Sequence, residues 1–277
     1  VNAKGGVLGK QITLVVADNK SDTAEAANAM QKLATQDKVI ASIAPIASSS
    51  VMAAAQVNES AKILGISPTA SNPNVTVDPE TGKVRDYLFR ATFIDPFQGA
   101  VMANFAKNTL KAQKAAVYIE NSSDYAKGLG KFFKETFVQN GGNIVSDEAY
   151  LAKDTDFKAT LTKIKASNPD VIFVPGYYQE VGMIIKQARE IGITVPILGA
   201  DGWDSAKLPE IAGAEALNNT FFSNHYSPDD NSPEIKNFVE AYKAEYGQVP
   251  DAFAALSYDA TMMIIEAIKR AGVEDSV

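Results

Sequence analysis

The chain has 277 residues, of which 46% are hydrophobic and 21% are charged, and its formal net charge is −7. This length and composition are typical of a globular protein with one large or two medium domains, and the scattered Lys and Arg exclude a basic face that binds nucleic acid. There is no cysteine and only one histidine, His225, so disulfides, thiolate catalysis and cysteine-ligated zinc are excluded and a Ser-His-Asp triad has little support. We therefore expect no metal and no cofactor.

The first part of the chain alternates short apolar runs with segments of helical period. The runs ITLVVA (12–17) and VIASIA (39–44) predict strands. Helices are expected from about Asp22 and from about Ser49, and Asp22 is a predicted N-cap because Glu25 stands three residues later. This alternation predicts a mostly parallel sheet with both faces covered by helices.

The same alternation resumes after YLFRAT (87–92). Strands are predicted at AAVYIE (115–120), NIVSDEAY (143–150) and VIFVPG (171–176), and helices from about Asp124, Asp156 and Gln179. A further helix is expected after Ser232, with Pro233 at its first position. The apolar residues of these helices fall on one face each, which predicts core packing and not a cofactor site. These stripes are Leu129, Phe132, Phe133 and Phe137; Phe157, Leu161 and Ile164; Val181, Ile184, Ile185 and Ala188; and Phe238, Val239, Tyr242 and Tyr246.

Two separate series of strands and helices predict two lobes. The segments TFIDPFQG (92–99) and FFSNHYSPDD (221–230) are candidate crossings because both are rich in turn residues after a strand. The helical segment 232–271 has no lobe of its own, so we expect it to return to the first lobe. We predict an α/β fold of two doubly wound, Rossmann-like lobes with parallel central sheets joined by hinge segments. The predicted boundaries are 1–94 with 225–277 for lobe 1, and 95–224 for lobe 2.

Motifs for a nucleotide site or a catalytic nucleophile are incomplete. GGVLGKQ (5–11) has the wrong spacing for a phosphate loop, lacks a hydroxyl after Lys10 and precedes a strand where a phosphate loop follows one. GISPT (65–69) lacks the glycine after Ser67 that a nucleophile elbow requires. The carboxylates occur mostly as helix caps and surface charges. An enzyme is therefore unsupported, and we expect no covalent chemistry.

Polar side chains recur just beyond the carboxyl ends of the predicted strands. In open α/β sheets ligands bind at that edge. Each residue alone is more often a cap or loop residue, but residues of this kind from both halves of the chain favour a ligand cleft between the lobes. They are Ser48 to Ser50, Ser67, Thr69, Ser71, Tyr125, Tyr177, Tyr178 and Asp201.

Five segments that span essentially the whole chain match one known family in order and spacing. They are NAKGGVLGKQITLVVADNKSD, SSSVMAAAQVNESAKILGISPTASNP, NSSDYAKGLG, DVIFVPGYYQEVGMIIKQAREIG and LGADGWDS. The chain resembles the periplasmic binding proteins of type I fold, in the branch that serves ABC transporters for leucine, isoleucine and valine. The resemblance implies a further strand and helix before NAKGG, central to the first lobe, and further strands after AIKRAGVEDSV. We therefore expect that the residues shown do not fold alone as an ordinary binding protein.

The resemblance implies how an α-amino acid is held. The Ser48 hydroxyl, with the amide and hydroxyl of Ser71, would meet the ligand carboxylate; the carbonyl of Thr69 and the carboxylate of Asp201 would take the ammonium. Physical reasoning agrees, because a helix N-terminus favours a carboxylate and a buried ammonium needs a carboxylate partner. Members of the family often have glutamate at the position of Asp201, so the shorter aspartate changes the depth of the ammonium site.

Four other residues are expected at the cleft or in its closure. The resemblance places Tyr125 on the opposite lobe and Tyr177 where it closes over the ligand. Ile46 and Trp203 are expected to border the cleft, with the alternative that Trp203 only braces its loop.

The implied function is capture of an aliphatic or branched-chain amino acid by hinge closure and its delivery to the membrane permease of an ABC transporter. We expect a monomer in the periplasm or outside the cell, with a lipid anchor at the outer face of the membrane as one option and the signal segment upstream of the residues shown. The alternatives are a ligand-sensing domain of a receptor or regulator with the same fold, binding an amino acid or a small amide, and an α/β enzyme that uses the same cleft.

Overall fold

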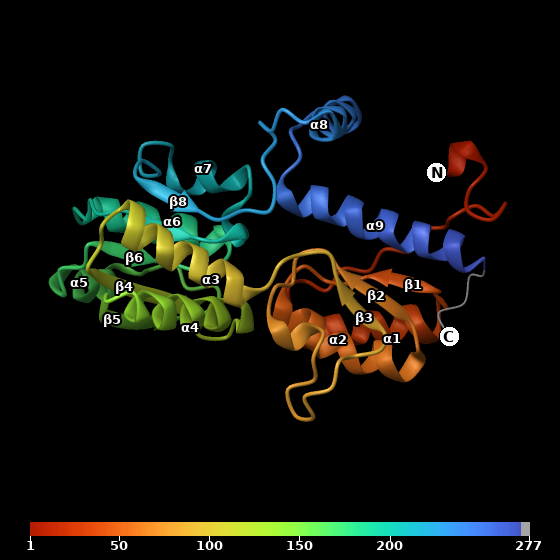
Figure 1. The fold of residues 1–277 in the computed structure, drawn as a ribbon, viewed down its shortest axis with the longest axis horizontal. Helices are drawn as coiled ribbons and strands as arrows, with labels where there is room; N and C mark the ends of the chain where they lie inside the picture. The colour runs from red at the N-terminus through yellow and green to blue at the C-terminus, as the bar shows by residue number, and fades with distance from the viewer. Residues whose placement is uncertain (273–277) are drawn as a thin grey trace. The chain divides into compact units, whose positions relative to one another are not determined.

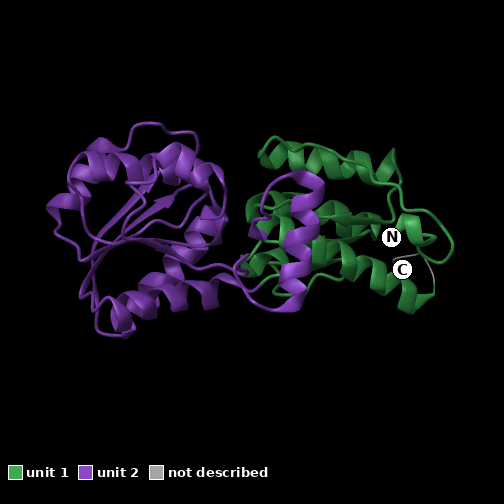
Figure 2. Ribbon diagram, turned by 90° about the horizontal axis from the view of Figure 1, so that it is seen from above, with its two compact units in different colours: residues 1–92, 253–277 green, residues 93–252 purple. Residues whose placement is uncertain are grey.

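The computed structural model describes residues 1–272 and divides the chain into two compact units (Figure 2). Unit 1 comprises Val1–Thr92 and the segment that begins at Phe253, and unit 2 comprises Phe93–Ala252. The units therefore change at 92 and 252, whereas the predicted lobe boundaries lie at 94 and 224. Between 224 and 252 the main element is α8 (Pro233–Tyr246), which buries no residue, so packing does not decide its lobe and the second predicted boundary stays a prediction.

Unit 1 contains a three-stranded parallel sheet in the order β1-β2-β3. The strands are β1 (Ala41–Ile43), β2 (Leu64–Ser67) and β3 (Leu88–Arg90). Helices α1 (Thr23–Thr35) and α2 (Ser48–Ala61) lie on one face of the sheet and α9 (Ala252–Ala271) lies on the other (Figure 1). Leu88 packs with Val51 of α2, while Ile66 packs with Ala260 and Ile264 of α9, so each face has its own apolar core.

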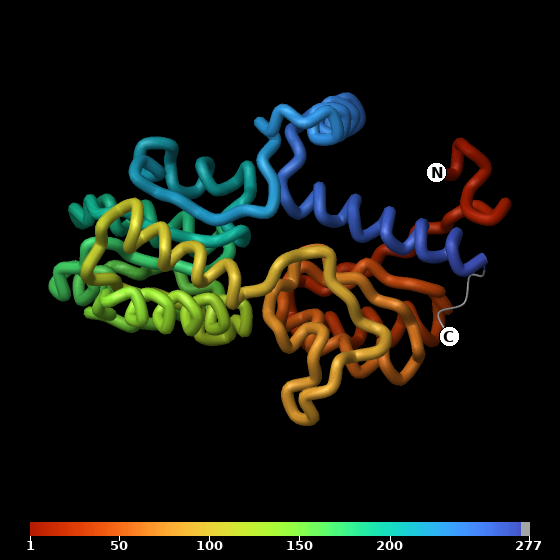
Figure 3. Tube along the Cα trace, in the orientation of Figure 1, coloured from red at the N-terminus to blue at the C-terminus, as the bar shows by residue number. Residues whose placement is uncertain are grey.

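The predicted strand at 12–17 is wrong, because residues 11–19 form no regular element. Figure 3 shows this stretch as an uncoiled trace before α1. Leu14 is 80% exposed and Val16 is 79% exposed, and no strand of residues 1–272 pairs with the segment. A strand needs a neighbour for its backbone N–H and C=O groups, so apolar alternation alone does not form one. The Asp22 cap that follows is confirmed, because its side chain accepts a hydrogen bond from the Glu25 amide at 2.9 Å.

Unit 2 contains a five-stranded sheet in the order β5-β4-β6-β7-β8, with every pair parallel. The strands are β4 (Lys114–Glu120), β5 (Asn143–Tyr150), β6 (Val171–Phe173), β7 (Ile197–Gly199) and β8 (Thr220–Phe222). From β4 the chain adds β5 on one side, and it then adds β6, β7 and β8 in turn on the other side, so the strand order reverses between β4 and β6. This doubly wound order confirms the predicted fold class and makes the carboxyl ends of β4 and β6 the edge at which such sheets bind ligands.

Two apolar cores cover the two faces of the unit 2 sheet. On β4, Val117 packs with α3 (Asp95–Asn104) and α4 (Asp124–Gln139), while its neighbour Tyr118 packs with α5 (Lys158–Ala166) and α6 (Tyr178–Glu190). The short helix α7 (Lys207–Ala212) adds Leu208 to the second core. Three of the four predicted apolar stripes are therefore core, except that Phe132 is only half-buried.

The predicted apolar stripe of α8 is not part of a core. Pro233 opens the helix as expected, but Phe238, Tyr242 and Tyr246 contact one another and the ring of Tyr226 without becoming buried. Tyr246 is 64% exposed. An amphipathic pattern shows which face of a helix is apolar, but burial needs a second element against that face. None of the helices within residues 1–272 has the length and apolar character needed to span a membrane.

Candidate ligand site

In unit 1 the polar residues after β1 and β2 form one hydrogen-bonded cluster. Ser48 is the first residue of α2 and is fully buried, and its Oγ accepts a hydrogen bond from the Asn72 amide at 3.3 Å. Thr69 Oγ1 donates to the carbonyl of Ile46 at 3.0 Å, and the Ala70 amide donates to Ser67 Oγ at 3.0 Å. These bonds hold the loop after β2 against the N-terminus of α2, where free amides and the helix dipole favour an anion.

Ser71 lies in the same loop and has an unused donor. It is 0% exposed, and its Oγ has no hydrogen-bond partner among the described residues. A buried hydroxyl without a partner is costly, so such groups in native proteins commonly meet a ligand or a bound water. The cluster around Ser48 and Ser71 therefore offers hydroxyl and amide donors to a carboxylate.

Arg90, which was not predicted from the sequence, binds the loop after β2 through its guanidinium group. Its Nη1 donates to the carbonyl of Asn72 at 2.9 Å, and its Nη2 donates to the carbonyl of Pro73 at 3.1 Å and to Thr76 Oγ1 at 2.7 Å. A guanidinium is a planar group with five donors, so it can bind several carbonyls of one turn at the same time. Arg90 is the last residue of β3, and a charged residue at the end of a predicted apolar run was the available signal.

In unit 2 the candidate site is centred on Asp201, which begins a short 3-10 turn (Asp201–Trp203) after β7 and is 2% exposed. Its Oδ1 accepts hydrogen bonds from Tyr125 Oη and from Gln98 Nε2, both at 2.7 Å. The Gly202 amide donates to Tyr125 Oη at 2.9 Å. Burial, and then the adjacent Asp201 carboxylate, raise the pKa of Tyr125 well above its ordinary value. Tyr125 is therefore a neutral donor that orients the Asp201 carboxylate.

Two residues of this cluster were not predicted from the sequence. Gln98 lies on α3 and is 0% exposed, and its Oε1 has no partner among residues 1–272. His225 follows β8, and its Nε2 lies 3.2 Å from Asp201 Oδ2. They lie in the segments 92–99 and 221–230, which were predicted only as crossings between the lobes. The available signal for a site residue there was His225, the single histidine of the chain.

The structure places the remaining predicted residues as follows. The Tyr177 ring stacks on Tyr125, with centroids 5.2 Å apart, and Ile46 is 43% exposed just before α2. Trp203 is 1% exposed in the core of unit 2, where its Nε1 donates to the carbonyl of Val174 at 3.0 Å. This position favours the alternative in which Trp203 braces the loop that carries Asp201. The closing role of Tyr177 and the lining role of Ile46 stay predictions.

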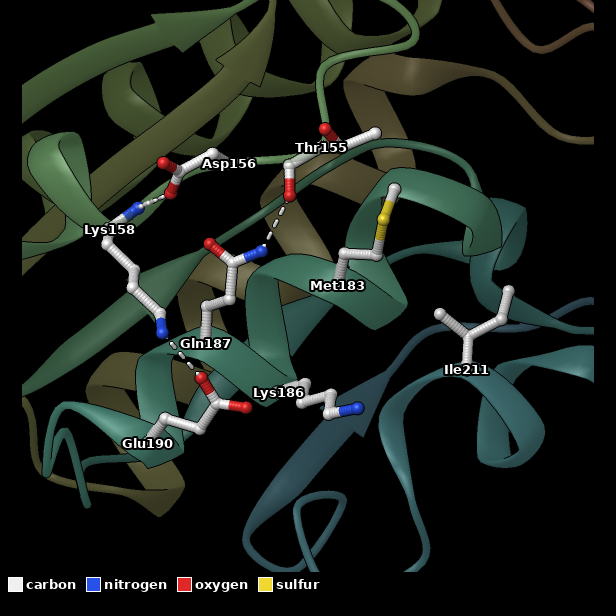
Figure 4. Close-up of a pocket in the computed structure, with 8 residues that line it drawn as sticks. All are labelled: Thr155, Asp156, Lys158, Met183, Lys186, Gln187, Glu190 and Ile211. Atoms are coloured by element: carbon white, nitrogen blue, oxygen red, sulfur yellow. Dashed lines mark hydrogen bonds and ion pairs between the residues drawn. The ribbon is translucent and has the colours of Figure 1, made fainter.

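A surface pocket of about 380 Å³ lies elsewhere in unit 2, beside α5, α6 and α7 (Figure 4). It is lined by Thr155, Asp156, Lys158, Met183, Lys186, Gln187, Glu190 and Ile211. Lys158 pairs with Glu190 at 2.9 Å and Gln187 donates to the carbonyl of Thr155 at 2.8 Å, so these groups bind one another across the pocket. None of the predicted site residues lines it. Within residues 1–272, no group of three or more His, Cys, Asp or Glu side chains could hold a metal ion.

Comparison with known proteins decides the family. The family model described as "Periplasmic binding protein" matches residues 1–277. The chain belongs to the periplasmic binding protein family. A curated relative, the "Amino acid binding protein" of Pseudomonas aeruginosa, is 31% identical over 275 residues, which are 99% of this chain and 72% of the relative.

Two solved structures of the family are also similar to this periplasmic binding protein. The leucine binding protein LivK of Thermotoga maritima has 40% identity and a TM-score of 0.93, over 99% of this chain and 77% of that chain. The branched-chain amino acid transporter substrate binding protein LivJ of Streptococcus pneumoniae, in complex with isoleucine, has 42% identity and a TM-score of 0.91, with the same coverage. These matches confirm both the predicted family and the predicted fold class.

Proposed function

We propose that this periplasmic binding protein captures a branched-chain or other aliphatic α-amino acid and delivers it to the membrane permease of an ABC transporter. The observation that carries the proposal is the contrast between two buried polar clusters. Unit 1 presents donors at a helix N-terminus, and unit 2 presents the carboxylate of Asp201. An α-amino acid carries the two complementary charges, and similar proteins are named for binding leucine or contain isoleucine.

In this proposal each cluster takes one end of the ligand backbone. Ser48 and Ser71 bind the carboxylate, while Asp201 and the carbonyl of Thr69 bind the ammonium. The proposal includes capture of the ligand by hinge closure, in which Tyr177 closes over the ligand. The apolar side chain of the ligand excludes water from both ion contacts, which strengthens them.

The protein acts by binding and not by catalysis. The Asp201 carboxylate is held by two neutral donors, Tyr125 and Gln98, in an arrangement that orients a charge for a cation. The similar LivJ protein is named as a transporter substrate binding protein, which favours a role in transport over a sensor domain or an enzyme. We place the protein outside the cytoplasmic membrane, and a monomeric state and a lipid anchor are part of the proposal.

A calorimetric and thermal-shift screen tests the ligand class. Leucine, isoleucine and valine should raise the unfolding temperature, because a ligand at about 100 times its Kd adds about 2.7 kcal/mol of stability to the folded state. Matched controls are the carboxamide of isoleucine, which has no carboxylate, and the deaminated acid, which has no ammonium. Both should bind much more weakly. If no free amino acid shifts the unfolding of folded protein, the proposed function is wrong.

The single tryptophan provides an optical readout of the same event. Trp203 follows Asp201 by two residues, and its Nε1 bond to Val174 holds the indole rigidly beneath that loop. We expect ligand binding at Asp201 to change the intensity of Trp203 emission, in a saturable titration whose midpoint agrees with calorimetry. Binding without any change in emission would contradict the placement of the ligand at this loop.

The unused hydroxyl of Ser71 gives a prediction that separates binding from stability. Ser71→Ala removes a buried donor that has no partner among the described residues, so the free protein should be as stable as the wild type or slightly more stable. Amino-acid affinity should fall by about 1–2 kcal/mol, because the ligand carboxylate loses a hydrogen bond. Thermal unfolding without ligand and calorimetry with ligand measure the two effects. A loss of stability with unchanged affinity would assign Ser71 to the scaffold.

A further inference from the structure

The single histidine of the chain lies beside the candidate ammonium acceptor. The side chains of His225 and Asp201 are 4% and 3% exposed, and Nε2 of the imidazole lies 3.2 Å from Oδ2 of the carboxylate. The imidazole also stacks on the ring of Phe93, with centroids 3.6 Å apart and planes inclined by 26°. Phe93 opens unit 2, so the stack joins the first and the second predicted crossing segments next to Asp201.

The two oxygens of Asp201 have partners of different kinds. Oδ1 accepts hydrogen bonds from Tyr125 and Gln98, which are neutral donors. Oδ2 is contacted by His225. Among the partners that the described residues give to Asp201, only the imidazole can carry a positive charge. The imidazole thus contacts Oδ2, the oxygen at which a ligand ammonium would balance the charge of Asp201.

The titratable groups around His225 are acidic. Asp201 contacts the imidazole directly, Tyr125 donates to the same carboxylate, and Asp204 Oδ2 accepts a hydrogen bond from Asn224, the residue before His225. Nearby carboxylates favour a proton on an imidazole, whereas burial disfavours it. Within residues 1–272, the side chains that contact the Asp201 carboxylate include neither Lys nor Arg, so a ligand ammonium would be the positive charge that competes with a protonated His225.

We propose that His225 is the internal counter-ion of Asp201 in the protein without ligand, and that an amino acid displaces its proton on binding. This inference rests on the proposed function, because it takes Asp201 as the acceptor of the ligand ammonium. Histidine takes up a proton below a pH of about 6.5, and a protonated His225 both neutralises Asp201 and repels the ammonium. Affinity is therefore full at higher pH and falls as the pH drops. Displacement of one proton weakens binding by at most about tenfold for each unit by which the pH falls.

The test compares the wild type with His225→Gln by calorimetry with isoleucine at about pH 7.5 and about pH 5.5, a range in which most carboxylates stay ionised. The glutamine amide can donate to Asp201 Oδ2 but does not titrate. The wild type should bind about tenfold more weakly at the lower pH and release protons, seen as a dependence of the binding heat on the buffer. His225→Gln should have equal affinity at both pH values. Equal affinity of the wild type at both values would overturn the inference.

Proton NMR of wild-type protein without added histidines gives an independent readout if the variant does not fold. One imidazole resonance is expected, and isoleucine should move its titration midpoint to lower pH. Identical titrations with and without isoleucine would overturn the inference, while the proposed function would stand. Absence of isoleucine, leucine and valine binding at both pH values would instead contradict the proposed function.

Discussion

Asp201→Ala should weaken amino-acid binding by about 2–5 kcal/mol, which is roughly 30- to 4,000-fold in Kd. In the proposed site, the substitution leaves the buried ligand ammonium without its carboxylate. It also removes the acceptor of two short hydrogen bonds, those from Tyr125 and Gln98. The loss of these hydrogen bonds affects the free and the bound protein alike, so the change in affinity comes mainly from the unpaired buried ammonium.

Calorimetry with isoleucine measures the effect, and two further variants define its origin. Asp201→Asn keeps the shape of the side chain but not its charge, so it should lose most of the same affinity. Asp229→Asn is the matched control, because Asp229 is an exposed aspartate of the same unit and its charge is solvated. Unchanged affinity in Asp201→Ala would remove Asp201 from the binding site.

Gly199→Ala should destabilise unit 2 by about 1–3 kcal/mol and weaken ligand binding with it. Gly199 is the last residue of β7, and a Cβ atom there would lie 2.0 Å from Cε2 of Trp203. The indole would have to move, and with it the bond from Trp203 Nε1 to the carbonyl of Val174. Because Asp201 belongs to the same turn as Trp203, the displacement also moves the carboxylate.

Denaturant unfolding followed by circular dichroism measures the stability of this variant. Gly130→Ala is the control, because its added Cβ would lie 2.9 Å from the Cγ2 methyl group of Ile119, farther than the contact at Gly199, inside a helix that alanine favours. The double variant Gly199→Ala with Trp203→Leu should recover part of the loss, because a smaller side chain relieves the contact. If Gly199→Ala is as stable as the wild type, the close packing of Trp203 on β7 is not a constraint on the loop.

Much of the architecture follows from local patterns in the sequence. The Asp22 cap and the apolar stripe of α4 locate helices, because caps and periodicity act within one or two turns of the chain. Ser48, Tyr125 and Asp201 could be predicted at the edge of the sheets, because each follows a predicted strand and parallel strands end at a common edge. These features depend on neighbours in the sequence, so the sequence by itself determined them.

The partners of those residues were decided only by the tertiary structure. Gln98 and His225 reach Asp201 from positions 103 and 24 residues away, and no local pattern encodes contacts of that range. The same reason explains the errors at 12–17 and at α8, because within residues 1–272 the first has no neighbouring strand and the second has no buried residue. Local sequence sets which surface is apolar or polar, whereas burial and pairing depend on what the fold brings against that surface.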